Sequence, residues 1–146
     1  MGNGLLILGA GGYGKVIAEA VEAGGDFARI AFLDDAKKGQ TVLGLEVIDG
    51  FNALRELSSR FDAAFVAIRN NELRSLVFNG LKKTGYRIPV IMHPGALVSP
   101  SAQIREGTAI LAGAVVNAGV KIGTACLINS GAVVEYDCRL GHAVRI

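Results

Sequence analysis

A six-residue repeat of branched aliphatic side chains fills the C-terminal third of the chain and constrains its fold more than any other feature. Six residues match neither the 3.6-residue period of a helix nor the two-residue alternation of a strand, and such repeats are typical of a parallel β-helix. Three hexapeptides make one triangular coil, so Ile104, Ile122 and Leu140 should stack on one face with their side chains inside. The full series is Val98, Ile104, Ile110, Val116, Ile122, Ile128, Val134, Leu140 and Ile146.

A second register, two residues earlier, holds small or slender side chains that fit where the chain bends toward the next face. Two of its members are cysteines, Cys126 and Cys138, and their 12-residue spacing puts them on different faces. We therefore predict two small buried thiols and no disulfide. The register comprises Ala102, Thr108, Ala114, Val120, Cys126, Ala132, Cys138 and Val144.

The residues before the repeat follow a different pattern, in which short apolar runs alternate with helical segments. This alternation predicts an α/β domain with a parallel sheet covered by helices on both faces. We place this domain at residues 1–93 and the β-helix at residues 94–146, because His93-Pro94-Gly95 punctuates the chain there. The expected strands are 5–8, 30–33, 63–68 and 88–91, and the expected helices are 16–23, 51–59 and 72–84.

A glycine-rich turn follows the first expected strand and has the spacing Gly9-x-Gly11-x-x-Gly14. Glycines allow backbone N–H groups to approach phosphate oxygens, and the following helix N-terminus favours negative charge. Asp34 ends the second strand, where an acidic side chain commonly contacts a ribose. A tight turn without a ligand, followed by a solvated Asp34-Asp35 pair, is the alternative. We favour a ligand the size of a nucleotide-linked sugar over NAD, since no residues remain for a substrate domain.

Composition and charge exclude several classes of partner. The net charge of +2 is small and scattered, which argues against nucleic acid. No apolar stretch is long enough to span a membrane, and the apolar start lacks the basic region of a signal peptide. We predict a cytoplasmic protein without nucleic-acid or membrane partners, and we assign no metal ligands.

Five motifs, in order along the whole chain, resemble those of a known family. They are Gly9–Lys15, Phe32–Asp35, Ala67–Asn71 followed by Arg74, His93–Ala102 and Asn129–Cys138. The chain resembles the bacterial sugar acetyltransferases typified by sialic-acid O-acetyltransferases and the N-acetyltransferases of UDP-linked 4-amino sugars. The resemblance implies a Rossmann-like domain, then a left-handed β-helix that forms a homotrimer and holds acetyl-CoA between subunits.

The resemblance also implies the site residues. Tyr136 stands at the position of the family's histidine base, with Asp137 as the orienting carboxylate and Asn129 framing the site. A phenol stays protonated at neutral pH, whereas imidazole titrates close to it, so Tyr136 is a poor base. Arg145 replaces a second family histidine, and His142 is a less favoured substitute base. The implied substrate-binding residues are Gly11, Gly12, Tyr13, Gly14, Asp34, Asp35 and Arg69.

Family members continue for several more coils, whereas residues 96–146 supply 51 residues, or about 2.8 coils of 18. We therefore expect a fragment or a shortened relative. The favoured function is acetyl-CoA-dependent acetylation of a UDP-linked amino sugar for surface-glycan synthesis, impaired by the short β-helix and by Tyr136. The alternative is a catalytically silent module that binds a nucleotide sugar. The sequence leaves open which sugar is bound and whether acylation is on nitrogen or oxygen.

Overall fold

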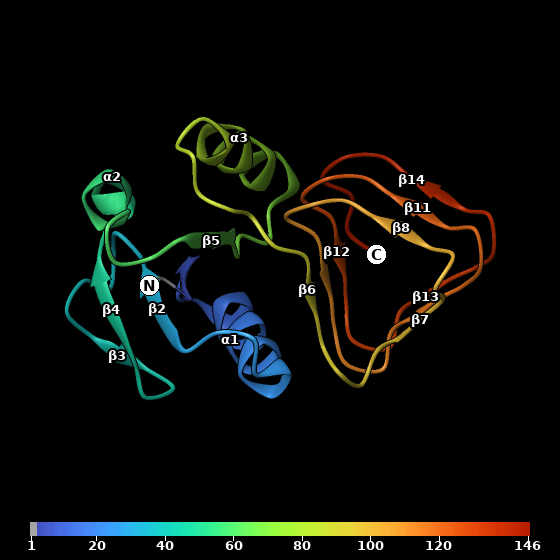
Figure 1. Cartoon of the computed structure of the whole chain (residues 1–146), viewed down its shortest axis with the longest axis horizontal. Coiled ribbons are helices and arrows are strands. Elements are labelled where there is room, and N and C mark those ends of the chain that lie inside the picture. The colour runs from blue at the N-terminus through green and yellow to red at the C-terminus, as the bar shows by residue number, and fades with distance from the viewer. Residues whose placement is uncertain (1–2) are drawn as a thin grey trace.

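The computed structural model describes residues 3–146 and places an α/β unit beside a triangular coil of short strands (Figure 1). The α/β unit contains one five-stranded sheet with the order β3-β4-β2-β1-β5. Strands β2, β4 and β5 run parallel to their neighbours, and only β3 is antiparallel. The bounds are β1 Gly4–Leu8, β2 Arg29–Leu33, β3 Thr41–Val42, β4 Leu45–Asp49 and β5 Ala63–Val66.

Helices cover both faces of this sheet, as the sequence predicted. All residues of β1 and β5 are buried, which explains why these strands are continuous apolar runs rather than alternating ones. Alternate side chains of β1 join two different cores, one with α1 and one with α2 and α3. The bounds are α1 Gly12–Gly24, α2 Leu54–Leu57, which follows a 3₁₀ turn at Phe51–Ala53, and α3 Asn71–Lys82.

One expectation about this sheet was wrong, and one of its elements was not predicted. The apolar run 88–91 does not form its fourth strand, because Ile91 and Met92 form β6, which pairs with β9 of the coil. Only Arg87 bridges to the sheet, at Ala63. The hairpin of β3 and β4 was not predicted, since its short strands carry exposed polar residues and show little periodicity.

The repeat folds as the parallel β-helix that was predicted, with its strands stacked 18 residues apart in three sheets. The repeated aliphatic side chains from Val98 to Leu140 form one core inside the triangle, and those of Ile110 and Ile128 are fully buried. Ile146, at the end of the series, is 44% exposed. The three sheets are β6-β9-β12, β7-β10-β13 and β8-β11-β14. The strands are β6 Ile91–Met92, β7 Leu97–Val98, β8 Gln103–Ile104, β9 Ala109–Ile110, β10 Val115–Val116, β11 Lys121–Ile122, β12 Leu127–Ile128, β13 Val133–Val134 and β14 Arg139–Leu140.

The three faces of the β-helix differ only in the side chains that point outward. On the α1 face (β6, β9, β12), these side chains are packed into the core beneath α1. On the apolar face (β7, β10, β13) and the basic face (β8, β11, β14), they meet solvent. The outward columns are Ile91, Ala109 and Leu127; Leu97, Val115 and Val133; and Gln103, Lys121 and Arg139, respectively.

The two cysteines are free thiols in different environments. Cys126 is fully buried, and burial raises the pKa of its thiol. The prediction was wrong for Cys138, which is exposed. Cys138 stacks over Val120 and lies on the last coil that the structure describes.

Candidate functional site

The predicted substrate-binding residues converge at one edge of the five-stranded sheet. The turns after β1, β2 and β5 leave the carboxyl ends of three neighbouring parallel strands. The chain continues from β1 to β2 on one side and later returns to β5 on the other, so this edge is a topological switch point. Open parallel sheets bind ligands at such points. The structure brings together here Gly11, Gly12, Tyr13, Gly14, Asp34, Asp35 and Arg69.

The glycines of the turn fall into two groups. Gly9 has a φ of 114°, and a side chain on Gly14 would collide with the carbonyl oxygen of Gly9, so the fold itself requires both. Gly11 and Gly12 are exposed, have no positive φ, and have nothing within 4 Å of an added Cβ. Neither conformation nor packing explains glycine at these two positions, whereas close approach of a ligand does.

Asp34 braces the glycine turn from the neighbouring strand. Its carboxylate oxygens accept hydrogen bonds from the N–H groups of Ala10 and Ala36, both at 2.9 Å. Asp35 likewise accepts a hydrogen bond at 2.9 Å from the N–H of Phe51. Both acids lie at the predicted edge, but their carboxylates already bind the chain's own backbone. Sequence spacing gave no sign of this bracing role.

The N-terminus of α1 presents partial positive charge to this edge. Its cap residue, Gly11, has no side chain, and the first turn contains no acidic residue. The N–H groups at the start of a helix lack intrahelical partners, and the helix dipole adds partial positive charge there. The turn is therefore suited electrostatically to a phosphate group.

Arg74 connects the switch-point edge to the β-helix. Its side chain is completely buried without a carboxylate partner, and burial lowers the pKa of its guanidinium. It donates to the carbonyl oxygens of Ile68 and Arg69 at 3.1 and 3.0 Å. It also donates to those of Ala125 and Ala143, at 2.6 and 3.0 Å, on two stacked corners of the β-helix. The fork geometry of arginine satisfies these acceptors together. No local sequence pattern indicated this role.

Tyr13 lies next to this arginine. Its hydroxyl is buried and has no hydrogen-bond partner within residues 3–146. Burial raises the pKa of Tyr13 well above its usual value, while the positive charges of Arg74 and Arg145 act in the opposite direction. Tyr13 is therefore a neutral hydroxyl with unused hydrogen-bonding capacity at the glycine turn.

The predicted catalytic residues lie at two corners of the β-helix, at opposite ends of β13. Tyr136 is 69% exposed, and its hydroxyl makes no hydrogen bond within the described residues. Asp137 beside it has a φ of 57°, and its carboxylate lies over Gly119 on the coil below. Asn129 is half-buried at the other corner, where its N–H donates to Ile146 at 3.0 Å. One chain does not bring Asn129 and Tyr136 together.

His142 lies at the third corner and is fixed by the coil below. Its Nδ1 accepts a hydrogen bond from the Thr124 N–H at 3.0 Å and lies 2.8 Å from the Thr124 hydroxyl. An Nδ1 that accepts from a backbone N–H leaves the proton on Nε2, which is then a donor rather than a base. Its position and tautomer both argue against His142 as a substitute for the base.

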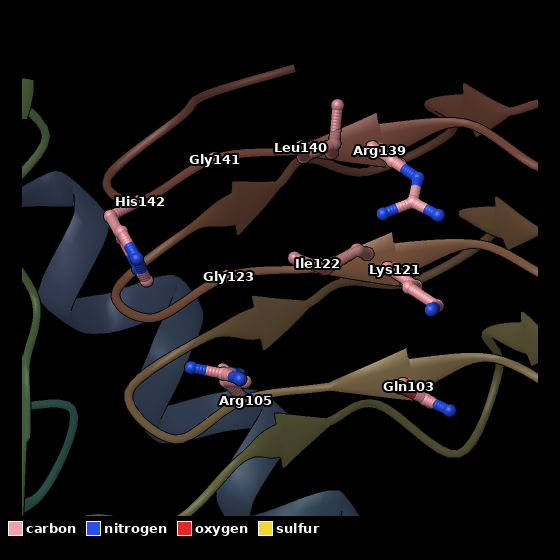
Figure 2. A pocket seen from close by; sticks show the side chains of 9 residues that line it. All are labelled: Gln103, Arg105, Lys121, Ile122, Gly123, Arg139, Leu140, Gly141 and His142. Atoms are coloured by element: carbon pink, nitrogen blue, oxygen red, sulfur yellow. The ribbon is translucent and has the colours of Figure 1, made fainter.

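A polar hollow on the basic face of the β-helix was not predicted from the sequence. The hollow has a volume of about 410 Å³ and is lined by Gln103, Lys121 and Arg139 from the outward column, with Arg105 and His142 at the turns (Figure 2). The sequence signal for this hollow was the polar or basic residue at every eighteenth position of the outward register, Gln103, Lys121 and Arg139. Among residues 3–146, no three His, Cys, Asp or Glu side chains group as metal ligands, and no helix is long and apolar enough to cross a bilayer.

An α/β unit with a phosphate-binding type of turn, joined to a left-handed β-helix, defines the class of sugar acetyltransferases that the motifs indicated. Residues 4–81 match the model of the PglD N-terminal domain, which covers more than half of the chain. The chain therefore belongs to this family of bacterial sugar acetyltransferases.

Curated and solved relatives agree with this assignment. UDP-N-acetylbacillosamine N-acetyltransferase of Bacillus subtilis is 39% identical over 109 residues, which are 73% of this chain and 50% of the relative, so the chain spans about half of its length. Perosamine N-acetyltransferase from Caulobacter crescentus, solved with CoA and GDP-perosamine, has a TM-score of 0.92 at 38% identity over 97% of this chain and 67% of its own. The acetyltransferase domain of PglB from Neisseria gonorrhoeae, solved with acetyl coenzyme A, has a TM-score of 0.94 at 38% identity over 99% and 70%.

Proposed function

We propose that this chain is an acetyl-CoA-dependent N-acetyltransferase for a nucleotide-linked amino sugar of a bacterial surface glycan, acting in the cytoplasm. Two of the relatives named above are N-acetyltransferases of sugars, the third is an acetyltransferase domain, and two were solved with CoA or acetyl-CoA. The observation that carries the proposal is the glycine turn at the switch point. Gly11 and Gly12, which neither conformation nor packing constrains, leave space for a nucleotide diphosphate. The uncapped N-terminus of α1 supplies partial positive charge for its phosphates.

The sugar acceptor and the base would meet between subunits of a homotrimer. The outward column of the apolar face leaves Leu97 and Val133 exposed by 69% and 54%, which favours contact with other copies of the chain. In a closed threefold ring, one edge of this face meets the opposite edge of the next subunit. That packing would bring Asn129 of one subunit near Tyr136 and Asp137 of its neighbour.

In the proposed reaction, the sugar amine attacks the thioester carbonyl of acetyl-CoA, an amide bond forms, and the thiol leaves. A base accepts the proton that the amine loses. Tyr136 is poorly suited to that step, so we propose slow turnover by this chain. Asp137 would therefore orient a catalytic imidazole only in the variant Tyr136→His. Tyr13 and Arg69 would line the site of the bound nucleotide sugar.

A catalytically silent nucleotide-sugar-binding module is the second candidate. One observation favours it: Tyr136 is highly exposed, and no described group is placed to remove its proton. Such a module would keep the nucleotide-sugar site at the glycine turn and the apolar face, but it would not transfer an acetyl group.

Release of free CoA from acetyl-CoA and a UDP-linked 4-amino sugar distinguishes the two candidates. For an impaired enzyme, Tyr136→His raises the rate, by roughly 10²- to 10⁴-fold if the imidazole acts as general base. Tyr136→Phe is the matched control and should leave the slow wild-type rate unchanged. No turnover by wild type or Tyr136→His, together with intact sugar-nucleotide binding, identifies a silent module. Loss of rate in Tyr136→Phe would show that the phenol itself acts.

The nucleotide site is tested separately by Gly12→Ala. The added methyl group meets no atom of the chain, so stability should be retained, and alanine favours a helix over glycine by up to about 1 kcal/mol. Calorimetric titration with UDP- and GDP-sugars should show weaker binding by roughly ten-fold, equivalent to about 1.4 kcal/mol. Unchanged affinity in a folded Gly12→Ala protein would place the ligand elsewhere.

A further inference from the structure

The guanidinium of Arg74 uses all of its hydrogen-bond donors inside the protein. An arginine side chain has five N–H groups, and here each of them has an acceptor. Because none is left over, Arg74 can act on a ligand only through its charge or through the groups that it holds. The five acceptors are the carbonyl oxygens of Ile68, Arg69, Ala125 and Ala143 and the side-chain oxygen of Asn71.

None of these acceptors neutralises the charge of Arg74. The ion pairs found within residues 3–146 join Lys38 to Asp49, Lys82 to Glu106 and Arg87 to Asp62, so none of them involves Arg74. A guanidinium that is buried without a carboxylate is destabilising. Burial accordingly lowers the pKa of Arg74, and the nearby cation of Arg145 lowers it further.

The attachment of α3 to the β-helix does not explain this buried charge. Phe78, one helical turn after Arg74, packs on Gly107, where an added Cβ would lie 2.5 Å from the ring. Lys82, one turn further along, pairs with Glu106 at 2.6 Å. These apolar and ionic contacts already join α3 to the β-helix, so its docking does not by itself require a charge at residue 74.

Residue 71 could neutralise Arg74 but does not. Asn71 is exposed, begins α3, and its side-chain oxygen accepts a hydrogen bond from Nη2 of Arg74 at 2.8 Å. Aspartate has nearly the same shape and would make a stronger, charge-assisted contact there. Aspartate would also stabilise the N-terminus of α3, where negative charge is favourable. The amide gives up this stability, as residues do where function opposes stability, and leaves the cation unpaired.

The charge of Arg74 reaches the glycine turn. Tyr13 directly follows Gly12 in α1, and the positive charges of Arg74 and Arg145 both act on its hydroxyl. Arg74 also holds the carbonyl oxygens of Ile68 and Arg69, which follow β5 at the same edge of the sheet. Charges interact more strongly through a protein interior than through water, so a phosphate at this turn would be attracted by Arg74 without contacting it.

We propose that Arg74 is a positioning residue, whose unpaired charge draws the diphosphate of a nucleotide-linked ligand to the glycine turn. Arg74 holds the loop after β5 and does not itself touch the ligand. This inference rests on the nucleotide site of the proposed function and adds a remote electrostatic contribution to it. An arginine that only joined the two units would tolerate neutralisation, whereas one that attracts phosphate would not.

The variant Asn71→Asp tests the proposal, because it neutralises Arg74 in place and keeps all of its hydrogen bonds. We expect Tm to rise by a few degrees as the buried cation gains a partner. Calorimetric titration should nevertheless show about ten-fold weaker binding of whichever of UDP and GDP the wild type binds. The corresponding monophosphate carries less charge and should lose only about three-fold. A purely structural role would raise Tm without changing either affinity.

The matched control is Asn70→Asp, which adds the same charge one residue earlier. Asn70 is the exposed N-cap of α3, and its side chain accepts a hydrogen bond from the N–H of Leu73 instead of from Arg74. Aspartate and asparagine cap helices about equally well, so Tm should not change. Solvent screens an exposed carboxylate, so the affinity for the diphosphate should fall by about two-fold at most.

The possible outcomes separate this inference from the proposed function. A wild type that binds neither UDP nor GDP would contradict the nucleotide site itself, and the inference would fail with it. Equal affinities of wild type and Asn71→Asp would overturn the inference alone. Equal losses for diphosphate and monophosphate, or equal losses in Asn70→Asp and Asn71→Asp, would also overturn it. An unchanged Tm in Asn71→Asp would show that Arg74 needs no partner and would contradict the premise.

Discussion

The apolar and basic faces of the β-helix share the same backbone and the same inward core but differ completely on the outside. Both consist of three two-residue strands in identical register, with aliphatic side chains inside. The outward residue of each strand is Leu or Val on one face and Gln, Lys or Arg on the other. The repeat therefore determines the shape of the coil, while the outward residues determine what each face binds.

The α1 face shows the same principle inside one chain. Its outward residues Ile91, Ala109 and Leu127 are apolar like those of the apolar face, and they are buried against the α/β unit. The apolar outward column of the α1 face is therefore covered by the α/β unit of the same chain. This comparison supports the proposal that the apolar face meets another copy of the chain.

Substitutions on one strand should separate the inward role from the outward role most strongly. Ile122→Ala removes a buried side chain of the inner core and should lower the free energy of unfolding by about 2–5 kcal/mol. Lys121→Ala changes the adjacent outward residue and should stay within about 1 kcal/mol of wild type. Urea denaturation of both variants provides the measurement. Similar losses for the two would contradict the assignment of inward and outward positions.

The contrast between the apolar and basic faces can be tested by adding the same charge to each. Leu97→Lys places a cation in the proposed subunit contact and removes a leucine whose burial stabilises by about 1.5–3 kcal/mol. We expect dissociation at protein concentrations at least ten-fold higher than for wild type, measured by sedimentation velocity. Gln103→Lys is the matched control at the corresponding position of the basic face. Equal effects of the two variants on association would contradict the proposed interface.

How much of the fold could be predicted depended on how local each sequence signal was. The hexapeptide repeat placed every strand from β7 onward, because inward aliphatics at fixed spacing determine a coil directly. The apolar run 88–91 was misassigned, since an apolar pattern does not say which of two sheets a strand joins. Arg74 was part of a recognised motif, but its bridging role could not be predicted, because its acceptors Ala125 and Ala143 lie 51 and 69 residues away.

The site shows the same limit. The glycine spacing located the turn and its edge of the sheet, which follow from strand order. The bracing of that turn by Asp34 was missed, because a carboxylate that binds a ribose and one that binds a backbone N–H look the same in a sequence. The family resemblance suggested the roles of Asn129 and Tyr136, but their separation in one chain follows only from the triangular coil, which places them at two different corners.

The smallest predicted effect concerns the charge on the basic face. In the absence of phosphate, Lys121→Gln should raise the free energy of unfolding by about 0.2–1 kcal/mol, because it removes a like-charge pair with Arg139. The gain should disappear at about 1 M salt, where screening acts over about 3 Å. Lys83→Gln, measured under the same conditions, should show no such salt-dependent gain. A stabilisation that persists at high salt would point to packing rather than repulsion and would remove the electrostatic contrast between the two faces.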